Sequence, residues 1–174
     1  MSCDGRDRKY KTSTEVLQEN NLLKSFNKKI ITVQSEQIQI VTDTILSNGF
    51  QVKINYKSVV DNPIIKRIKS LKDSITELYY KNFEAEILVL KNGILINEGV
   101  IMKSLFKEFG NTSFWKNSTM QFVWIDHENL TDNHIFLKTS FNLVNTDIYK
   151  DFIIKIDNDG NIQIKETTLS KTII

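Results

Sequence analysis

Hydrophobic and polar residues alternate with a period of two over much of the chain, most clearly across residues 36–60. Two segments there place mainly apolar or β-branched side chains on one face, and Asn48-Gly49 lies between them. The members of that face are Ile38, Ile40, Thr42, Thr44 and Leu46, then Phe50, Val52, Ile54, Tyr56, Ser58 and Val60. A period of two with one apolar face is typical of a half-buried antiparallel sheet. Asn48-Gly49 predicts a two-residue type I′ turn, since Asn tolerates positive φ and Gly adopts it freely.

The same period continues after this first hairpin. Residues 83–98 predict a second hairpin around Asn92-Gly93. Four more strands are expected near residues 119–126, 134–144, 150–157 and 161–168. Successive strands with turn residues between them predict a mainly β fold, an antiparallel β-sandwich or partly open barrel of about eight strands.

Short helices are predicted at two places. Thr12 or Ser13 ahead of Glu15 is typical of a helix N-cap. Apolar residues at helical spacing predict a second helix that ends at Gly110 as its C′ residue, and these are Ile101, Leu105, Phe106 and Phe109. A short strand is expected at residues 30–33.

The segment 64–80 fits two patterns. It follows Asp61-Asn62-Pro63, which is a turn signature, and its apolar residues recur at helical spacing. Its second half also alternates like a strand. We expect a loop or broken helix followed by a strand.

Composition is that of an ordinary folded protein, with 40% hydrophobic and 25% charged residues among 174. We expect a flexible tether over residues 1–13 and a single β-rich domain over residues 14–174. A net charge of +2 is too small to predict a nucleic-acid partner. No apolar run approaches the roughly 20 residues that span a bilayer.

The chain contains one cysteine, Cys3, which excludes an internal disulfide. Polar residues follow it directly. Two interpretations remain open. Cys3 is either the lipid-accepting cysteine of a bacterial lipoprotein or a chance cysteine in a cytosolic protein.

Three sequence segments carry a resemblance to a known family. They are TDTILSNGFQVKI at 42–54, NFEAEI at 82–87 and MKSLF at 102–106. Together with Cys3 and its polar tail, they resemble small lipoproteins of the Bacteroidetes cell envelope, a family of unknown function. The resemblance implies a lipidated Cys3 and residence in the cell envelope, and it transfers no catalytic residues. No acidic run follows Cys3, which favours the periplasmic side over the cell surface.

One expected loop combines imidazoles with carboxylates, namely Asp126, His127, Asp132 and His134. Such groups bind zinc and similar ions. A metal-assisted hydrolase using loop 126–134 is therefore one hypothesis. A solvated loop tip explains the same residues, and the chain has no third histidine.

Other polar groups have simpler explanations. Glu84 and Glu86 share a strand face at about 7 Å, a spacing used in glycoside hydrolysis, but a solvated outer face is favoured. Residues 157–161 faintly resemble a calcium loop, yet a hairpin turn accounts for them. The basic residues of 66–72 are interrupted by acidic neighbours, so a solvated face is favoured there too.

Most aromatic side chains of the chain are expected in the core, and one or two are candidates for a ligand pocket or partner patch. Trp115, Trp124 and Phe136 are the residues we single out. The sequence thus favours a lipid-anchored, non-enzymatic domain without a cofactor. Its expected partner is an envelope protein or a small apolar ligand, and its membrane contact is through the anchor only. The alternatives are the hydrolase above and a cytosolic protein-interaction module.

Overall fold

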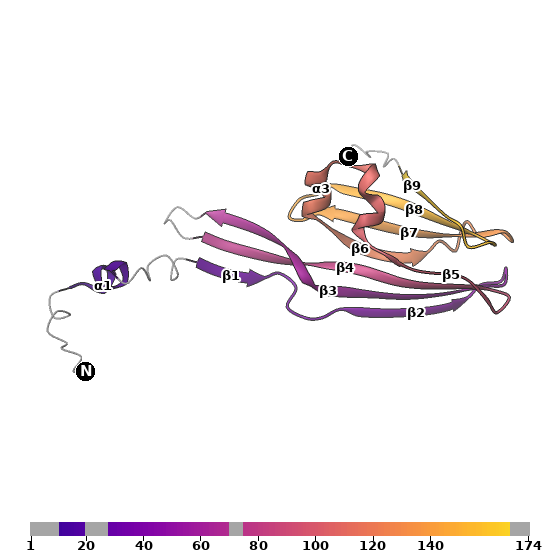
Figure 1. Cartoon of the computed structure of the whole chain (residues 1–174), viewed down its shortest axis with the longest axis horizontal. Helices are drawn as coiled ribbons and strands as arrows, with labels where there is room; N and C mark the ends of the chain where they lie inside the picture. Colours follow the sequence, from indigo (N-terminus) through magenta and orange to yellow (C-terminus); the bar gives the residue numbers. More distant parts are fainter. Residues whose placement is uncertain (1–10, 20–27, 70–74, 168–174) are drawn as a thin grey trace. The chain divides into compact units, whose positions relative to one another are not determined.

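The computed structural model describes residues 11–19, 28–69 and 75–167. Within these ranges the chain forms nine strands and three short helices, so the predicted mainly β fold is confirmed (Figure 1). Residues 1–10, including Cys3, lie outside the described residues. None of the described helices is long and apolar enough to cross a membrane.

The chain divides into two compact units, and the larger one comprises residues 34–64 and 80 onward. Its first sheet has the strand order β2-β3-β4-β5. The bounds are β2 Gln39–Ile45, β3 Phe50–Lys69, β4 Ile75–Lys91 and β5 Ile94–Ile101. The β2–β3 and β4–β5 pairs are antiparallel hairpins, as the alternation predicted.

The second sheet of this unit is an antiparallel meander in the order β6-β7-β8-β9. Its strands lie close to the four predicted positions: β6 Ser118–Ile125, β7 His134–Leu143, β8 Tyr149–Asp157 and β9 Ile162–Thr167. The two sheets share one hydrophobic core and form no closed barrel, which is consistent with the predicted β-sandwich.

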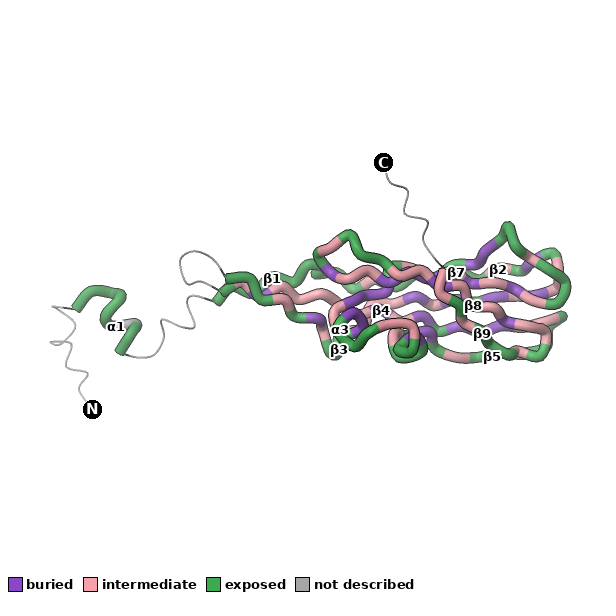
Figure 2. The backbone as a smooth tube through the Cα atoms, turned by 90° about the horizontal axis from the view of Figure 1, so that it is seen from above, coloured by how far each residue is buried: buried purple, intermediate pink, exposed green. Residues whose placement is uncertain are grey.

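The core is built from every second side chain of the facing strands, and Figure 2 shows buried positions alternating with less buried ones along them. Phe50 and Val52 on β3 are fully buried, as are Ile135 and Leu137 on β7. The inward face predicted for residues 50–56 is therefore confirmed. β2 differs because it is an edge strand, and its Ile40 remains 56% exposed although it pairs with a core residue.

The two Asn-Gly turns have different geometries. Asn92 and Gly93 both have positive φ, at 51° and 81°, as a type I′ turn requires. At the first turn only Gly49 does, at 83°. Its N–H donates to the Leu46 carbonyl at 3.1 Å, so the loop has three residues and ends in a glycine bulge. The type I′ prediction for Asn48-Gly49 was wrong.

The expected turn at 61–63 and the loop or broken helix after it were also wrong. β3 runs through Asp61-Asn62-Pro63 without interruption, and Asn62 within it has a positive φ of 55°. The side-chain amide of Asn82 on β4 donates to the Asn62 carbonyl. β4 begins at Ile75, so both halves of the segment extend as strands on either side of residues 70–74, which lie outside the described residues. Pairing with neighbouring strands has overridden the helical spacing.

The predicted helix near 101–109 is a 3-10 helix, η2 Lys103–Phe109. With three residues per turn, Phe106 and Phe109 face the core, whereas Leu105 is 44% exposed. Gly110 is extended rather than left-handed, so its predicted C′ role was wrong. A Cβ there would lie 3.0 Å from the Trp115 indole nitrogen. Close packing thus favours glycine. A second helix, α3 Thr112–Asn117, follows directly.

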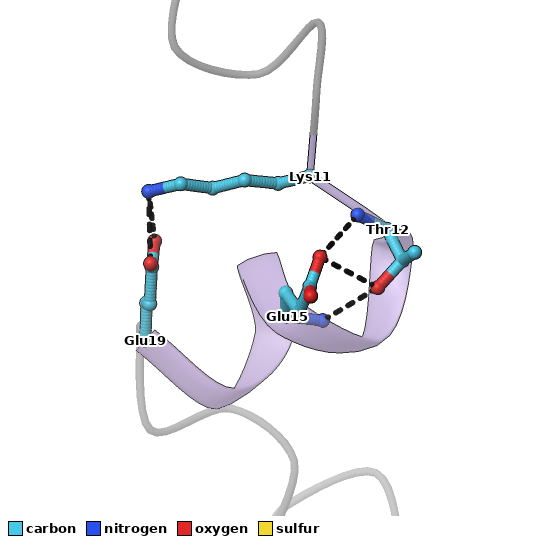
Figure 3. Close-up of polar contacts among 4 residues, drawn as sticks. All are labelled: Lys11, Thr12, Glu15 and Glu19. Atoms are coloured by element: carbon cyan, nitrogen blue, oxygen red, sulfur yellow. Dashed lines mark hydrogen bonds and ion pairs between the residues drawn. The ribbon is translucent and has the colours of Figure 1, made fainter.

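The smaller unit contains helix α1 Ser13–Glu19 and strand β1 Lys28–Thr32. Thr12 is the N-cap of α1, as predicted: its hydroxyl accepts from the Glu15 N–H at 3.3 Å, and the Glu15 carboxylate accepts from the Thr12 N–H at 2.7 Å (Figure 3). This reciprocal capping box satisfies two N–H groups. β1 pairs in parallel with the first residues of β4, which the alternation did not predict.

A buried carboxylate binds side chains from three strands of this unit. Glu77 is 3% exposed and binds the Lys28 ammonium at 2.9 Å and the Arg67 guanidinium at 3.0 Å. The Tyr79 hydroxyl donates to it as well, at 3.1 Å. These contacts, the bond to Lys28 first, lower the pKa of Glu77 despite its burial. Arg67 of the predicted basic cluster is thereby paired with an acidic neighbour.

Candidate functional site

The outer face of the second sheet carries an aromatic surface at its β6 edge. Trp124 is 53% exposed between two buried neighbours on β6, so its side chain points away from the core. The Phe122 ring stacks on it, with centroids 3.7 Å apart and an interplanar angle of 15°. We call this region the Trp124 surface, and its residues are Phe122, Trp124, Phe136, Lys138 and Ile153.

Strand register brings these residues together. Trp124 pairs with Lys138 on β7, and Lys138 pairs with Ile153 on β8. Phe136 is two residues before Lys138 and therefore faces the same side. A shallow hollow of about 260 Å³ lies here, lined by Phe122, Trp124, Lys138 and Ile153 among others. Two of the three aromatic residues predicted for a binding patch, Trp124 and Phe136, are thus on one face.

An ion pair between a partly exposed lysine and a buried carboxylate lies beside this surface. The Lys138 ammonium lies 2.9 Å from the Asp126 carboxylate, and Asp126 is only 3% exposed. Burial alone would raise the pKa of Asp126. The pKa of Asp126 is nevertheless lowered, because its carboxylate accepts hydrogen bonds from the side chains of Asn129 and Lys138 and from the N–H of Glu128. Asp126 therefore stays ionised and holds Lys138 in place beside Trp124.

Trp115 is not part of the Trp124 surface. It lies in α3, is 6% exposed, and packs in the core against Phe106, Phe114, Phe141 and Phe152. One edge of it lines a separate cavity beside the two short helices. The sequence signal that distinguishes the two tryptophans is alternation: Val123 and Ile125 flank Trp124 as inward residues, which places Trp124 outward.

The four residues proposed for a metal site have separate surroundings. Asp126 is engaged as described, and the His134 ring lies edge-on to Phe136 at 4.9 Å. His127 and Asp132 are exposed. No group of three or more His, Cys, Asp or Glu side chains in the described ranges is arranged to hold a metal ion. The hydrolase hypothesis stays a prediction.

The loop that carries these residues is packed rather than free. The side-chain amide of Asn48 donates to the Thr131 carbonyl at 2.6 Å, and the Lys91 ammonium donates to the Asp132 carbonyl at 2.7 Å. The loop from β6 to β7 is thereby bound to the turns of the opposite sheet. Its polar residues have a structural role at this end of the sandwich.

The other polar candidates are engaged in local contacts. The Lys57 ammonium bridges Glu84 and Glu86, and the Asn55 amide donates to Glu86 at 2.8 Å. These bonds, that to Lys57 first, lower the pKa of Glu86. The Asp157 carboxylate accepts from the N–H groups of Asp159 and Asn161, at 3.0 and 2.9 Å, within its own turn. A hairpin turn accounts for the calcium-like residues, as expected.

Lys138 and Ile153 were not identified from the sequence. Lys138 and Ile153 each alternate with buried residues along their strands, so the sequence could predict that they point outward. Their proximity to Trp124 depends on the register between strands, which the sequence pattern does not give. Comparison with known proteins adds no further residue. No model of a known protein family matches the chain, and no curated protein matches its sequence.

Proposed function

We propose that this protein is a non-enzymatic binding domain that docks a partner protein on the Trp124 surface. The observation that carries the proposal is the 53% exposure of Trp124 on the outer face of the four-stranded sheet. Tryptophan is among the residues most enriched in the energetic centres of protein interfaces. The Phe122 ring already stacks on the Trp124 indole before a partner binds. The Trp124 side chain therefore loses little conformational freedom on docking.

A protein is favoured over a small apolar ligand by the shape of this surface. The hollow at Trp124 has about 260 Å³, below the roughly 300–1,000 Å³ of typical small-molecule sites. The surface around it combines apolar Ile153 with the fixed charge of Lys138. An apolar centre with a polar rim is the usual anatomy of a protein interface.

We further propose that the domain is anchored in the bacterial cell envelope through a lipid on Cys3, facing the periplasm. The support is the position of Cys3 ahead of a polar segment and the resemblance to envelope lipoproteins. Mass spectrometry of the protein from its own host tests the anchor. We expect a lipid-modified peptide that begins at Cys3, and an unmodified Cys3 within a longer peptide would refute the anchor without affecting the docking proposal.

Docking can be tested by photo-crosslinking in the host cell. A photoreactive amino acid in place of Phe136 should give a discrete adduct, and Trp124→Ala should abolish it. The matched control places the photoreactive residue at Lys53, an exposed position on the other sheet. Equal adducts from both positions would contradict a docking site at Trp124.

The partner found in this way allows an affinity measurement. We expect Trp124→Ala to weaken binding by about 30-fold, corresponding to about 2 kcal/mol for an interface centre. Ile45→Ala serves as the control, since Ile45 is an exposed apolar residue on β2 of the other sheet. An equal loss in both variants would show that Trp124 has no special role.

A further inference from the structure

A cavity of about 520 Å³ lies beside the two short helices of the larger unit. Its lining residues are Lys103, Lys107, Thr112, Trp115 and Lys116. The volume is within the range of small-molecule sites. Three lining side chains are cationic and none is acidic, so the cavity presents positive charge over an apolar wall.

The three lysines have no carboxylate partner among the residues that the structure describes. The Lys103 ammonium donates to the Ser118 carbonyl at 2.9 Å, and the ammonium groups of Lys107 and Lys116 form no hydrogen bond or ion pair with any described residue. Burial lowers the pKa of Lys103 to about 8. A half-buried ammonium without a counter-ion is costly to keep charged, and an anion in the cavity would offset that cost.

The apolar wall includes a tryptophan whose polar atom is also unpaired. The Trp115 indole nitrogen is buried and has no hydrogen-bond partner among the described residues. Nearly all buried donors in proteins are paired, so this one is an exception. The ring is held rigidly by the surrounding phenylalanines, which gives the cavity a fixed aromatic edge.

We propose that this cavity binds a small organic anion, whose carboxylate or phosphate contacts the ammonium groups of Lys103, Lys107 and Lys116 and whose apolar part lies against Trp115. The three lysines that line the cavity supply the attraction for the anion, and their aliphatic stems and the Trp115 indole supply the apolar contact. This site is separate from the Trp124 surface and does not depend on the docking proposal.

The test uses phenyl phosphate as the probe, with inorganic phosphate and phenol as its two halves, at pH 7 and constant ionic strength. Binding is followed through the NMR signal of the Trp115 indole N–H, assigned in the variant Trp124→Phe. We expect a saturable shift with phenyl phosphate, binding at least about tenfold weaker for inorganic phosphate, and no saturable shift with phenol. Equal affinity for the two phosphates, or saturable binding of phenol, would overturn the assignment of an organic anion.

Variants of the exposed lysines keep the test independent of folding. Lys107→Met with Lys116→Met should weaken phenyl phosphate binding by at least about tenfold, because two of the three cations are removed. Lys165→Met, which removes an exposed lysine on β9, should leave it unchanged. Equal affinities in the double variant and this control would refute the site, as would the absence of any saturable shift up to about 10 mM ligand.

Discussion

The Lys91 ammonium lies 4.1 Å from the centroid of the Phe50 ring, over the aromatic face at the turn end of the first sheet. The same nitrogen donates to the carbonyl groups of Asn48 and Asp132, each at 2.7 Å. Asn48 lies in the turn between β2 and β3, and Asp132 lies in the loop between β6 and β7 of the other sheet, so this one cation connects the two layers at this end of the sandwich.

Lys91→Met should therefore destabilise the fold by about 2 kcal/mol, since it removes one cation–π contact and leaves two carbonyl groups without a charged donor. Chemical denaturation measures this change. Lys53→Met is the control: Lys53 forms an exposed ion pair with Asp43, and such pairs contribute little. Similar losses in both variants would contradict a special role for Lys91.

Gly160→Ala should be much more destabilising than Gly93→Ala. Both glycines have positive φ, 79° and 81°, so both variants carry the backbone strain of about 1–2 kcal/mol. Only at Gly160 would the new Cβ meet another group, the Ile96 carbonyl oxygen at 1.9 Å, whereas nothing lies within 4 Å at Gly93. The difference in unfolding free energy between the two variants measures how tightly this turn packs on β5. Equal losses would show that the turn moves away from β5 at no cost.

Tyr56→Phe should cost about 1 kcal/mol. The Tyr56 hydroxyl donates to the carbonyl groups of Met120 and Gln121 on β6, at 3.0 and 3.1 Å, whereas its ring stacks on Phe83 at 5.1 Å. The variant keeps the stack and loses only the hydrogen bond between the layers. Chemical denaturation gives the value, and Phe83→Leu, which keeps the hydroxyl contacts but loses the stack and some buried apolar volume, is the comparison.

Burial raises the pKa of Tyr56 well above its ordinary value. The folded state therefore holds this proton more tightly than the unfolded state does. Its contribution is fully present below the unfolded pKa of about 10 and is lost as the pH rises beyond it. Stability measured above pH 10 should fall more steeply for the natural protein than for Tyr56→Phe, and parallel curves would contradict the burial of this hydroxyl.

Asp126→Asn should lower stability at neutral pH by about 1–3 kcal/mol, because it removes a charged acceptor and leaves Lys138 without its counter-ion. The pKa of Asp126 is lowered in the folded state. Its contribution is thus present above the unfolded pKa of about 3.9 and is lost as the pH falls through the folded value. Denaturation from pH 7 down to pH 2 should show the two proteins converging in acid, and a constant difference would contradict ionisation of Asp126.

Local structure was readable from the sequence at several places where neighbours along the chain decide the outcome, although the turn type at Asn48-Gly49 was not. The capping box of Thr12 and Glu15 and the hairpin at Asn92-Gly93 depend on residues within a few positions of one another. The alternation over Phe50, Val52 and Ile54 likewise required an inward face and an antiparallel partner. These features gave the β-sandwich as one of two architectures.

Where the sequence-based prediction failed, distant partners decided the structure. The apolar spacing after Pro63 suits a helix, but strand pairing makes the described residues on both sides of 70–74 extended. Leu105 was expected on the same side as Phe106 and Phe109, yet with the tighter 3-10 winding of η2 only the two phenylalanines face the core, and Leu105 is 44% exposed.

The candidate sites show the same division. Alternation by itself turned Trp124 and Phe136 outward, because successive side chains of a strand must point to opposite faces. Only the tertiary structure decided that Lys138 and Ile153 join them, that Trp115 is buried among phenylalanines, and that three lysines surround one cavity. The physical reason is that side-chain direction follows from local backbone geometry, whereas register and helix packing depend on contacts between residues far apart in the chain.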